Sequence, residues 1–162
     1  MSERPPMPRR QPAEGGREGK LKRTTVMDGK ETVVLLVMPS TERRSGFVPK
    51  LRALGGRLLA AESCRDFRAL LRRHGDVDVV VTDTTLSDGN WCDVLNYVLK
   101  QGSQANVVVA SEAGDAKLWS EVLWRGAYDM LVEPVATEEV ERVMRGALRT
   151  SPPLSYAQGV PA

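Results

Sequence analysis

Aromatic residues, histidine and cysteine are scarce in this chain of 162 residues. Aromatic residues make up 5% of it, and it has one histidine and two cysteines. So few aromatic side chains leave no extended stacking surface for single-stranded nucleic acid. The one histidine, His74, follows Arg72 and Arg73 and is expected at a solvated helix end, so an ordinary Ser-His-Asp hydrolase triad has no support. Cys64 and Cys92 lack the spacing of metal ligands, so we expect reduced thiols and a cytoplasmic protein.

Long apolar runs and glycine-rich phosphate loops are also missing. No apolar run reaches the roughly 18 residues that a membrane-spanning helix needs, so we expect no membrane insertion. The N-terminus is basic but lacks the apolar stretch of a secretory signal. The pair Gly55-Gly56 is typical of a helix end and does not have the pattern of a phosphate-binding loop. With no catalytic or nucleotide-binding motif, the sequence does not predict an enzyme.

Charge is distributed unevenly along the chain. The chain has 23 basic and 21 acidic residues, and residues 1–30 hold eight of the basic and four of the acidic ones. The rest of the chain therefore holds 15 basic and 17 acidic residues. The first segment is rich in Pro and Gly and predicts a disordered basic leader. Binding of nucleic acid or an acidic partner through this leader is a weaker alternative, and nucleic acid is not the expected partner. Residues 150–162 predict a second disordered tail, which leaves one domain at 31–149.

Within residues 31–149, apolar runs alternate with helical patterns. The runs that predict strands lie at 32–37, 57–61, 77–82, 106–110 and 128–132. The apolar residues that repeat at helical spacing predict helices around 47–54, 63–71, 91–98, 118–125 and 137–148. Fully apolar strands that alternate with amphipathic helices predict an α/β fold with a doubly wound, five-stranded parallel sheet covered on both faces.

Individual residues indicate where the predicted helices begin. Pro49 indicates that the first helix starts late or is kinked, because proline lacks the N–H that a helix interior uses. Ser63 and Thr137 are expected to cap the second and last helices with their hydroxyl groups.

Three segments at predicted strand ends resemble the receiver domain of bacterial response regulators. Residues 79–89 resemble the segment that ends the third strand on an aspartate and continues into a Leu-(Pro)-Asp-Gly turn. Residues 107–111 resemble the fourth strand with its hydroxyl residue, and 126–134 resemble the fifth strand with its terminal Lys-Pro. The resemblance covers about 31–148 and implies the flavodoxin-like, CheY-like three-layer sandwich.

The resemblance also implies a phosphorylation site at the carboxyl ends of the strands. In the family an aspartate accepts a phosphoryl group from a histidine kinase, and two acids after the first strand help to hold Mg²⁺. A lysine after the fifth strand neutralises the phosphate, and a Ser or Thr bonds it and moves a switch aromatic. Asp83 aligns with the phosphoacceptor and Ser111 with the hydroxyl residue, and Thr84 lies in the expected pocket.

The chain departs from the family at most charged positions of this pocket. Met38 and Pro39 replace the acidic pair, Glu133 replaces the lysine, and Met130 stands at the switch position. Since neither Met38 nor Pro39 can hold Mg²⁺, we expect no cofactor and weak or absent Mg²⁺ binding. Charges about 5 Å apart interact by roughly 3 kcal/mol at an effective dielectric near 20, so Glu133 replaces an attraction of that order by a repulsion.

Plain structural roles compete with each of these assignments. Asp83 would be a relic acid at a strand end, and Ser111 would cap the loop that follows it. Asp83 and Glu133 together would make a two-carboxylate cation site, but two ligands bind a divalent ion weakly.

We therefore predict a stand-alone degenerate receiver of a two-component system, acting as a protein-interaction module with impaired phosphoryl acceptance. The alternative is a phosphate-accepting receiver in a phosphorelay, with Asp83 as phosphoacceptor. The stretch after Leu148 is too short for an output domain, so we expect the chain to act through a protein partner. That partner would be a histidine kinase or another signalling protein.

Two tryptophans indicate a surface for that partner. Trp119 and Trp124 lie five residues apart on the predicted fourth helix and point about 140° apart. At least one of them should be exposed, and exposed tryptophans often anchor interfaces. We expect partner docking or homodimerisation at the surface of the fourth helix, fifth strand and fifth helix.

Overall fold

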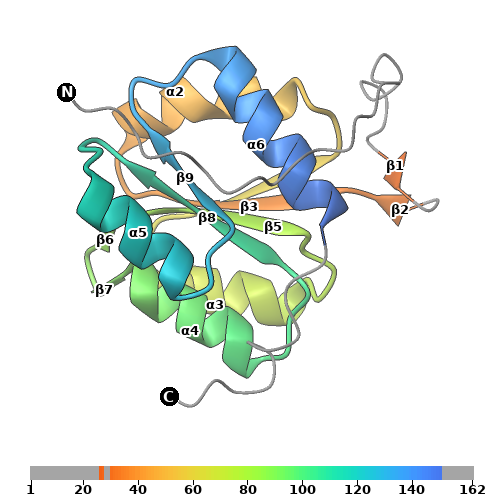
Figure 1. Cartoon of the computed structure of the whole chain (residues 1–162). Coiled ribbons are helices and arrows are strands. Elements are labelled where there is room, and N and C mark those ends of the chain that lie inside the picture. The colour runs from red at the N-terminus through yellow and green to blue at the C-terminus, as the bar shows by residue number, and fades with distance from the viewer. Residues whose placement is uncertain (1–25, 28–29, 151–162) are drawn as a thin grey trace.

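The computed structural model describes residues 26–27 and 30–150, and its centre is a five-stranded parallel sheet (Figure 1). The strands are β3 (Val33–Val37), β4 (Arg57–Ala61), β5 (Val79–Asp83), β8 (Asn106–Ser111) and β9 (Asp129–Val132). Their order across the sheet is β4-β3-β5-β8-β9, and all four pairings are parallel. The predicted doubly wound sheet is confirmed, and the predicted strand ends differ from the observed ones by at most two residues.

The Val-rich runs form the middle of the sheet because they are buried on both faces. Every residue of β3, β5 and β8 is buried, as expected for central strands of a parallel sheet. In the register of β5 and β8, Asp83 lies beside Ala110. The last residue of the central strand is therefore paired with β8 alone, because the register with β3 ends at Thr82.

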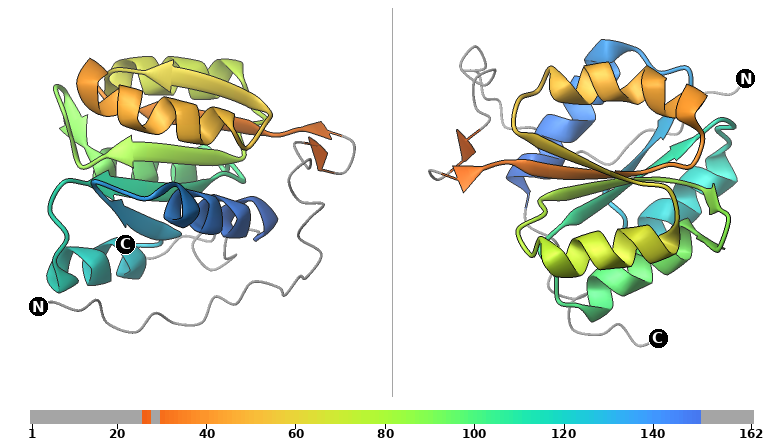
Figure 2. Two further views of the ribbon diagram at one scale, coloured as in Figure 1. Left: turned by 90° about the horizontal axis from the view of Figure 1, so that it is seen from above. Right: turned by 180° about the vertical axis from the view of Figure 1, so that it is seen from behind.

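Five helices cover the sheet in two layers. They are α2 (Thr41–Arg52), α3 (Cys64–Arg73), α4 (Trp91–Lys100), α5 (Ala116–Trp124) and α6 (Thr137–Arg149). Helices α2 and α6 lie on one face, and α3, α4 and α5 lie on the other (Figures 1 and 2). Each layer has its own core, with Phe47 and Met144 in the first and Phe67 and Val94 in the second.

Two predicted caps have different outcomes. Ser63 precedes α3, and its hydroxyl accepts the Asp66 N–H at 3.1 Å, as predicted. The prediction for Thr137 was wrong: it is the first helical residue of α6, and Ala136 before it offers no side-chain cap. Thr137 therefore takes a helical backbone conformation, which a capping residue does not have.

Helix α2 begins earlier than Pro49 suggested. It starts at Thr41, where the Ser40 hydroxyl accepts the Arg43 N–H at 3.1 Å, and Pro49 lies inside it. The first turn is polar, so apolar periodicity gave no signal there. The predicted late start was wrong, and this early turn carries Arg43 to the carboxyl edge of the sheet.

Two short antiparallel pairs were not predicted. β1 (Val26–Met27) pairs with β2 (Lys30–Glu31), and β6 (Thr85–Leu86) pairs with β7 (Gly89–Asn90). The first pair lies partly within the segment expected to be a leader, so regular structure begins before residue 31. The remainder of that segment and the tail after residue 150 lie outside the described residues. No helix in the described part is long and apolar enough to span a membrane.

Candidate functional site

The carboxyl ends of β5 and β9 bring two acidic side chains together. Asp83 ends β5, and Glu133 follows β9. Their side chains are 6% and 16% exposed, so each carboxylate is largely removed from water. The sequence predicted both residues at this edge of the sheet, and the structure places them around a common partner.

That partner is Arg43, in the first turn of α2. One guanidinium nitrogen, Nη1, donates to Asp83 Oδ2 at 2.6 Å. Nε donates to the two Glu133 oxygens at 3.1 and 3.2 Å, and Nη2 also bonds Oε2 of Glu133. The arginine is thus bidentate on Glu133 and bridges the two carboxylates, a geometry that the planar guanidinium fork favours.

The electrostatics of the site follow from this bridge. The hydrogen bond to Glu133 raises the pKa of the Arg43 guanidinium above its already high usual value; burial opposes this, and the bond to Asp83 adds to it. Arg43 therefore stays charged and offsets the repulsion expected between Asp83 and Glu133. A third carboxylate, on the exposed Glu112, lies 3.6 Å from Arg43 Nε.

Both oxygens of Asp83 are engaged in the described structure. Oδ1 accepts the backbone N–H of Thr84 at 2.7 Å, and Oδ2 accepts from Arg43. A carboxylate that attacks phosphorus needs cations beside both it and the incoming oxygens. Here the cation beside Asp83 is the Arg43 guanidinium, which also bonds Glu133.

Ser111 takes the structural role that the sequence offered as an alternative. Its hydroxyl donates to the Ala113 carbonyl at 2.7 Å and accepts the Ala113 N–H at 3.0 Å. It therefore closes the turn after β8, and both of these bonds are made within its own loop.

Met38 lies in the hydrophobic core and not in the pocket. Its side chain is fully buried with Leu36 and Phe47, and its N–H donates to the Ala61 carbonyl at 3.0 Å. Pro39 is half-buried. Among the described residues, no group of three or more His, Cys, Asp or Glu side chains is arranged to hold a metal ion.

Met130 and Trp119 are both buried in the core under α5. Met130 is 3% and Trp119 7% exposed. The Trp119 indole N–H points to Asp129 Oδ1 at 3.4 Å. Assigning Trp119 to a partner surface was therefore wrong, because its ring packs inward on the Val122 side of α5.

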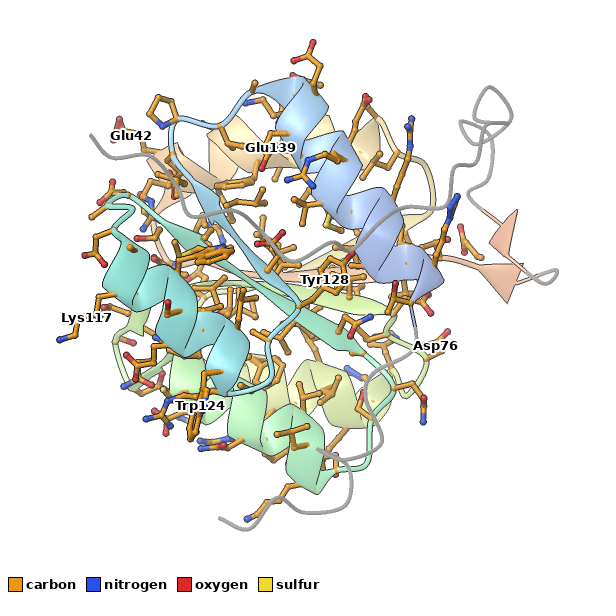
Figure 3. The ribbon with its side chains drawn as sticks, in the orientation of Figure 1. Glu42, Asp76, Lys117, Trp124, Tyr128 and Glu139 are labelled. Carbon is orange, nitrogen blue, oxygen red and sulfur yellow. The ribbon has the colours of Figure 1, made fainter. Side chains whose placement is uncertain are left out.

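Trp124 is the exposed member of the pair, as the 140° offset predicted. It is 80% exposed and ends α5 on the outside of the molecule (Figure 3). The other large exposed apolar side chain in the described part is Val132, at 40%, in β9. The surface prediction thus rests on Trp124 alone of the two tryptophans.

Sequence reasoning missed Arg43 because it searched for acids after the first strand. The family pattern directs attention to positions 38 and 39, and the guanidinium comes from a helical turn a few residues later. The signal for Arg43 in the sequence is charge balance. Two acids at the same edge of the sheet, at the ends of β5 and β9 with β8 between them, require a cation, and Arg43 and Arg44 are the basic residues that follow the first strand most closely.

Comparison with known proteins agrees with this architecture. No family model matches the chain. The response regulator protein PilR of Pseudomonas aeruginosa is 29% identical over 94 residues, which cover 58% of this chain and 21% of PilR. The match therefore spans about a fifth of that relative.

Solved structures of receiver domains superpose on most of the chain. A response regulator receiver domain protein from Clostridium thermocellum has a TM-score of 0.67 at 19% identity, over 73% of this chain and 94% of the other. The beryllofluoride-activated NtrC4 receiver domain dimer has a TM-score of 0.66 at 20% identity, over 72% of this chain and 96% of the other. The CheX–CheY complex from Borrelia burgdorferi has a TM-score of 0.66 at 20% identity, over 72% of this chain and 88% of the other. The fold is that of response-regulator receiver domains, as the three sequence segments predicted.

Proposed function

We propose that this chain is a pseudo-receiver: a protein-interaction module, not an enzyme, that keeps the receiver fold and has lost efficient phosphoryl acceptance. The observation that carries the proposal is the Arg43 bridge between Asp83 and Glu133. The bridge places an internal, permanent cation at the carboxylate that the family phosphorylates. One guanidinium therefore balances part of the negative charge of the two carboxylates within the chain, without an exchangeable ion.

The residues after β3 support the same conclusion. A divalent ion needs several oxygen ligands. Met38 is buried in the core, and Pro39 offers no side-chain oxygen. Glu133 is engaged by Arg43 at two points, so its carboxylate is committed to the arginine.

Incubation with acetyl phosphate and Mg²⁺, followed by intact-protein mass spectrometry, tests the proposal. We expect the mass to remain that of the unmodified chain, with an active receiver as positive control for the reagent. Stoichiometric addition of one phosphoryl group, abolished by Asp83→Asn, would instead make the chain a working phosphorelay receiver.

We further propose that the module acts in the cytoplasm by docking on a histidine kinase or another signalling protein, or on a second copy of itself. Two of the similar structures are a receiver dimer and a complex of CheY with CheX. In this chain Trp124 at the end of α5 and Val132 in β9 are exposed apolar side chains of the kind that an interface would bury. The free thiols of Cys64 and Cys92 agree with a reducing compartment.

A further inference from the structure

The outer face of α3 carries a stripe of arginines. Arg65, Arg68 and Arg72 follow at the spacing i, i+3, i+7, so they project from one side of the helix over about 10 Å. All three are exposed, and Arg73 is exposed on the adjoining side. Helix α3 lies beside α4 in the lower layer of the sandwich, on the side away from α2 and α6 (Figure 2).

These arginines differ from those of α6 in having no acidic partner within the described residues. On α6, Arg142 pairs with Glu139 at 2.9 Å and Arg145 with Glu141 at 3.7 Å. On α3 the single acid is Asp66, whose Oδ2 accepts the Glu62 N–H at 3.4 Å. In the described part, the guanidinium groups of Arg65, Arg68 and Arg72 therefore make no ion pair, although Asp66 lies in the same helix and Asp88 at its N-terminus.

A tyrosine of α4 orders two members of the stripe. The Arg68 guanidinium lies 5.6 Å from the centre of the Tyr97 ring, and Arg72 Nη1 donates to the Tyr97 hydroxyl at 3.5 Å. The ring is itself fixed edge-on against the buried Phe67 at 5.7 Å. Stacking on an aromatic face restrains a guanidinium and leaves most of its N–H groups free for an anion.

We propose that the α3 stripe docks an acidic segment of a protein partner, with carboxylates spaced along a helix to match Arg65, Arg68 and Arg72. Arginine forks suit paired contacts with carboxylates, and ordering by Tyr97 reduces the entropy lost on binding. A protein segment fits better than a nucleic acid because three arginines over about 10 Å match two turns of an acidic helix, whereas binding to duplex DNA commonly uses roughly 6–10 phosphate contacts.

The test uses a fluorescently labelled helical peptide of about 20 residues with Glu at every third and fourth position on one face. A peptide of the same composition with scattered acids, and a duplex DNA, are the competing probes. Binding to the full chain is measured by anisotropy at low and at physiological salt. The variant R68Q/R72Q is compared with R142Q/R145Q, which removes the same charge from α6.

We expect the striped peptide to bind more tightly than the scattered one and to lose about tenfold in affinity with R68Q/R72Q. R142Q/R145Q should change the affinity less than about twofold. Arg65→Gln alone should also weaken binding, and its side chain makes no hydrogen bond or ion pair in the described structure. Equal losses in both double variants, absence of binding, or tighter binding of DNA would overturn the proposal. It does not depend on whether Asp83 accepts a phosphoryl group.

Discussion

At the carboxyl end of β5, charge balance depends on one side chain. Arg43 is 18% exposed and contacts two carboxylates that are more than four-fifths buried. Replacing it by methionine keeps most of its aliphatic volume but leaves Asp83 and Glu133 without a cation. Removing one partner of a buried ion pair is strongly destabilising, so Arg43→Met should lower the free energy of unfolding by about 2 kcal/mol in urea titrations.

Arg44 is the matched control for that measurement. It neighbours Arg43 on α2 and pairs at 3.5 Å with Glu62, which is 65% exposed. A pair with one partner in water contributes little, so Arg44→Met should cost below about 1 kcal/mol. Equal losses in the two variants would contradict the bridging role of Arg43.

At the residue scale, the sequence could predict the acids but not their partner. Asp83 and Glu133 were found because each follows a recognisable strand. Arg43 was missed because its turn is polar and has no motif. Met38 was expected not to hold a metal, and its burial in the core could not be predicted without knowing how β3 and α2 pack.

At the scale of elements, the start of β4 depends on a glycine where any side chain would be strained. Gly56 has φ +86°, and an added Cβ would lie 2.5 Å from the Thr32 carbonyl oxygen. Since that neighbour is backbone, it cannot rotate away. Gly56→Ala should cost roughly 2 kcal/mol or more in unfolding free energy, because strain and overlap add.

A substitution at Gly102 separates the backbone strain from the steric overlap. Its φ is +66°, but nothing lies within 4 Å of an added Cβ. Gly102→Ala should therefore show the strain alone, about 1 kcal/mol. A Gly56→Ala cost no larger than that of Gly102→Ala would show that the loop before β4 relaxes around the methyl group.

The β6–β7 turn stabilises the start of α3 through Asp88. Its carboxylate accepts the N–H groups of Cys64 at 2.7 Å and Arg65 at 3.1 Å. The bond from Cys64 is the main cause that lowers the pKa of Asp88 in the folded state. The stabilisation is therefore complete above the ordinary pKa of a carboxyl group, near pH 4, which applies to the unfolded chain. It is lost as the pH falls through the lower pKa of Asp88 in the folded state.

Asp88→Asn should accordingly have a lower thermal midpoint than the wild type near neutral pH, and the two midpoints should converge in acid. Thermal unfolding followed by circular dichroism across this range measures the difference. Asp76→Asn controls for the loss of one charge, because Asp76 lies exposed in the turn after α3 (Figure 3). A constant difference between wild type and Asp88→Asn at every pH would contradict the assigned role.

Most elements could be predicted because their periodicity reflects burial. The Val runs of β3, β5 and β8 are buried on both faces, and α4 and α6 carry clear apolar stripes. The start of α2 could not be predicted, because its first turn is polar and has no apolar periodicity. The strand pair β6–β7 could not be predicted either, because strands of two residues are too short to show a period. The cap of α3 by Asp88 depends on a contact between distant segments.

At the scale of the whole molecule, the exposed Trp124 provides the test of association. Its ring is 80% exposed, so Trp124→Ala should change unfolding free energy by less than about 0.5 kcal/mol. The same variant should reduce self-association or partner binding, because a tryptophan buried at an interface contributes strongly. Analytical ultracentrifugation and partner titration of wild type and variant measure this. No change in either would exclude the α5 surface as an interface.

Under the proposed function, Arg43 takes the place of an exchangeable metal ion, and calorimetric titration of the wild-type chain with Mg²⁺ measures this. Asp83 and Glu133 are committed to Arg43, and positions 38 and 39 supply no side-chain ligand. We expect no saturable binding below roughly millimolar Mg²⁺, since too few oxygen ligands are free. Saturable binding in the micromolar range that disappears in Asp83→Asn would show that Arg43 yields to the metal, and would contradict the account.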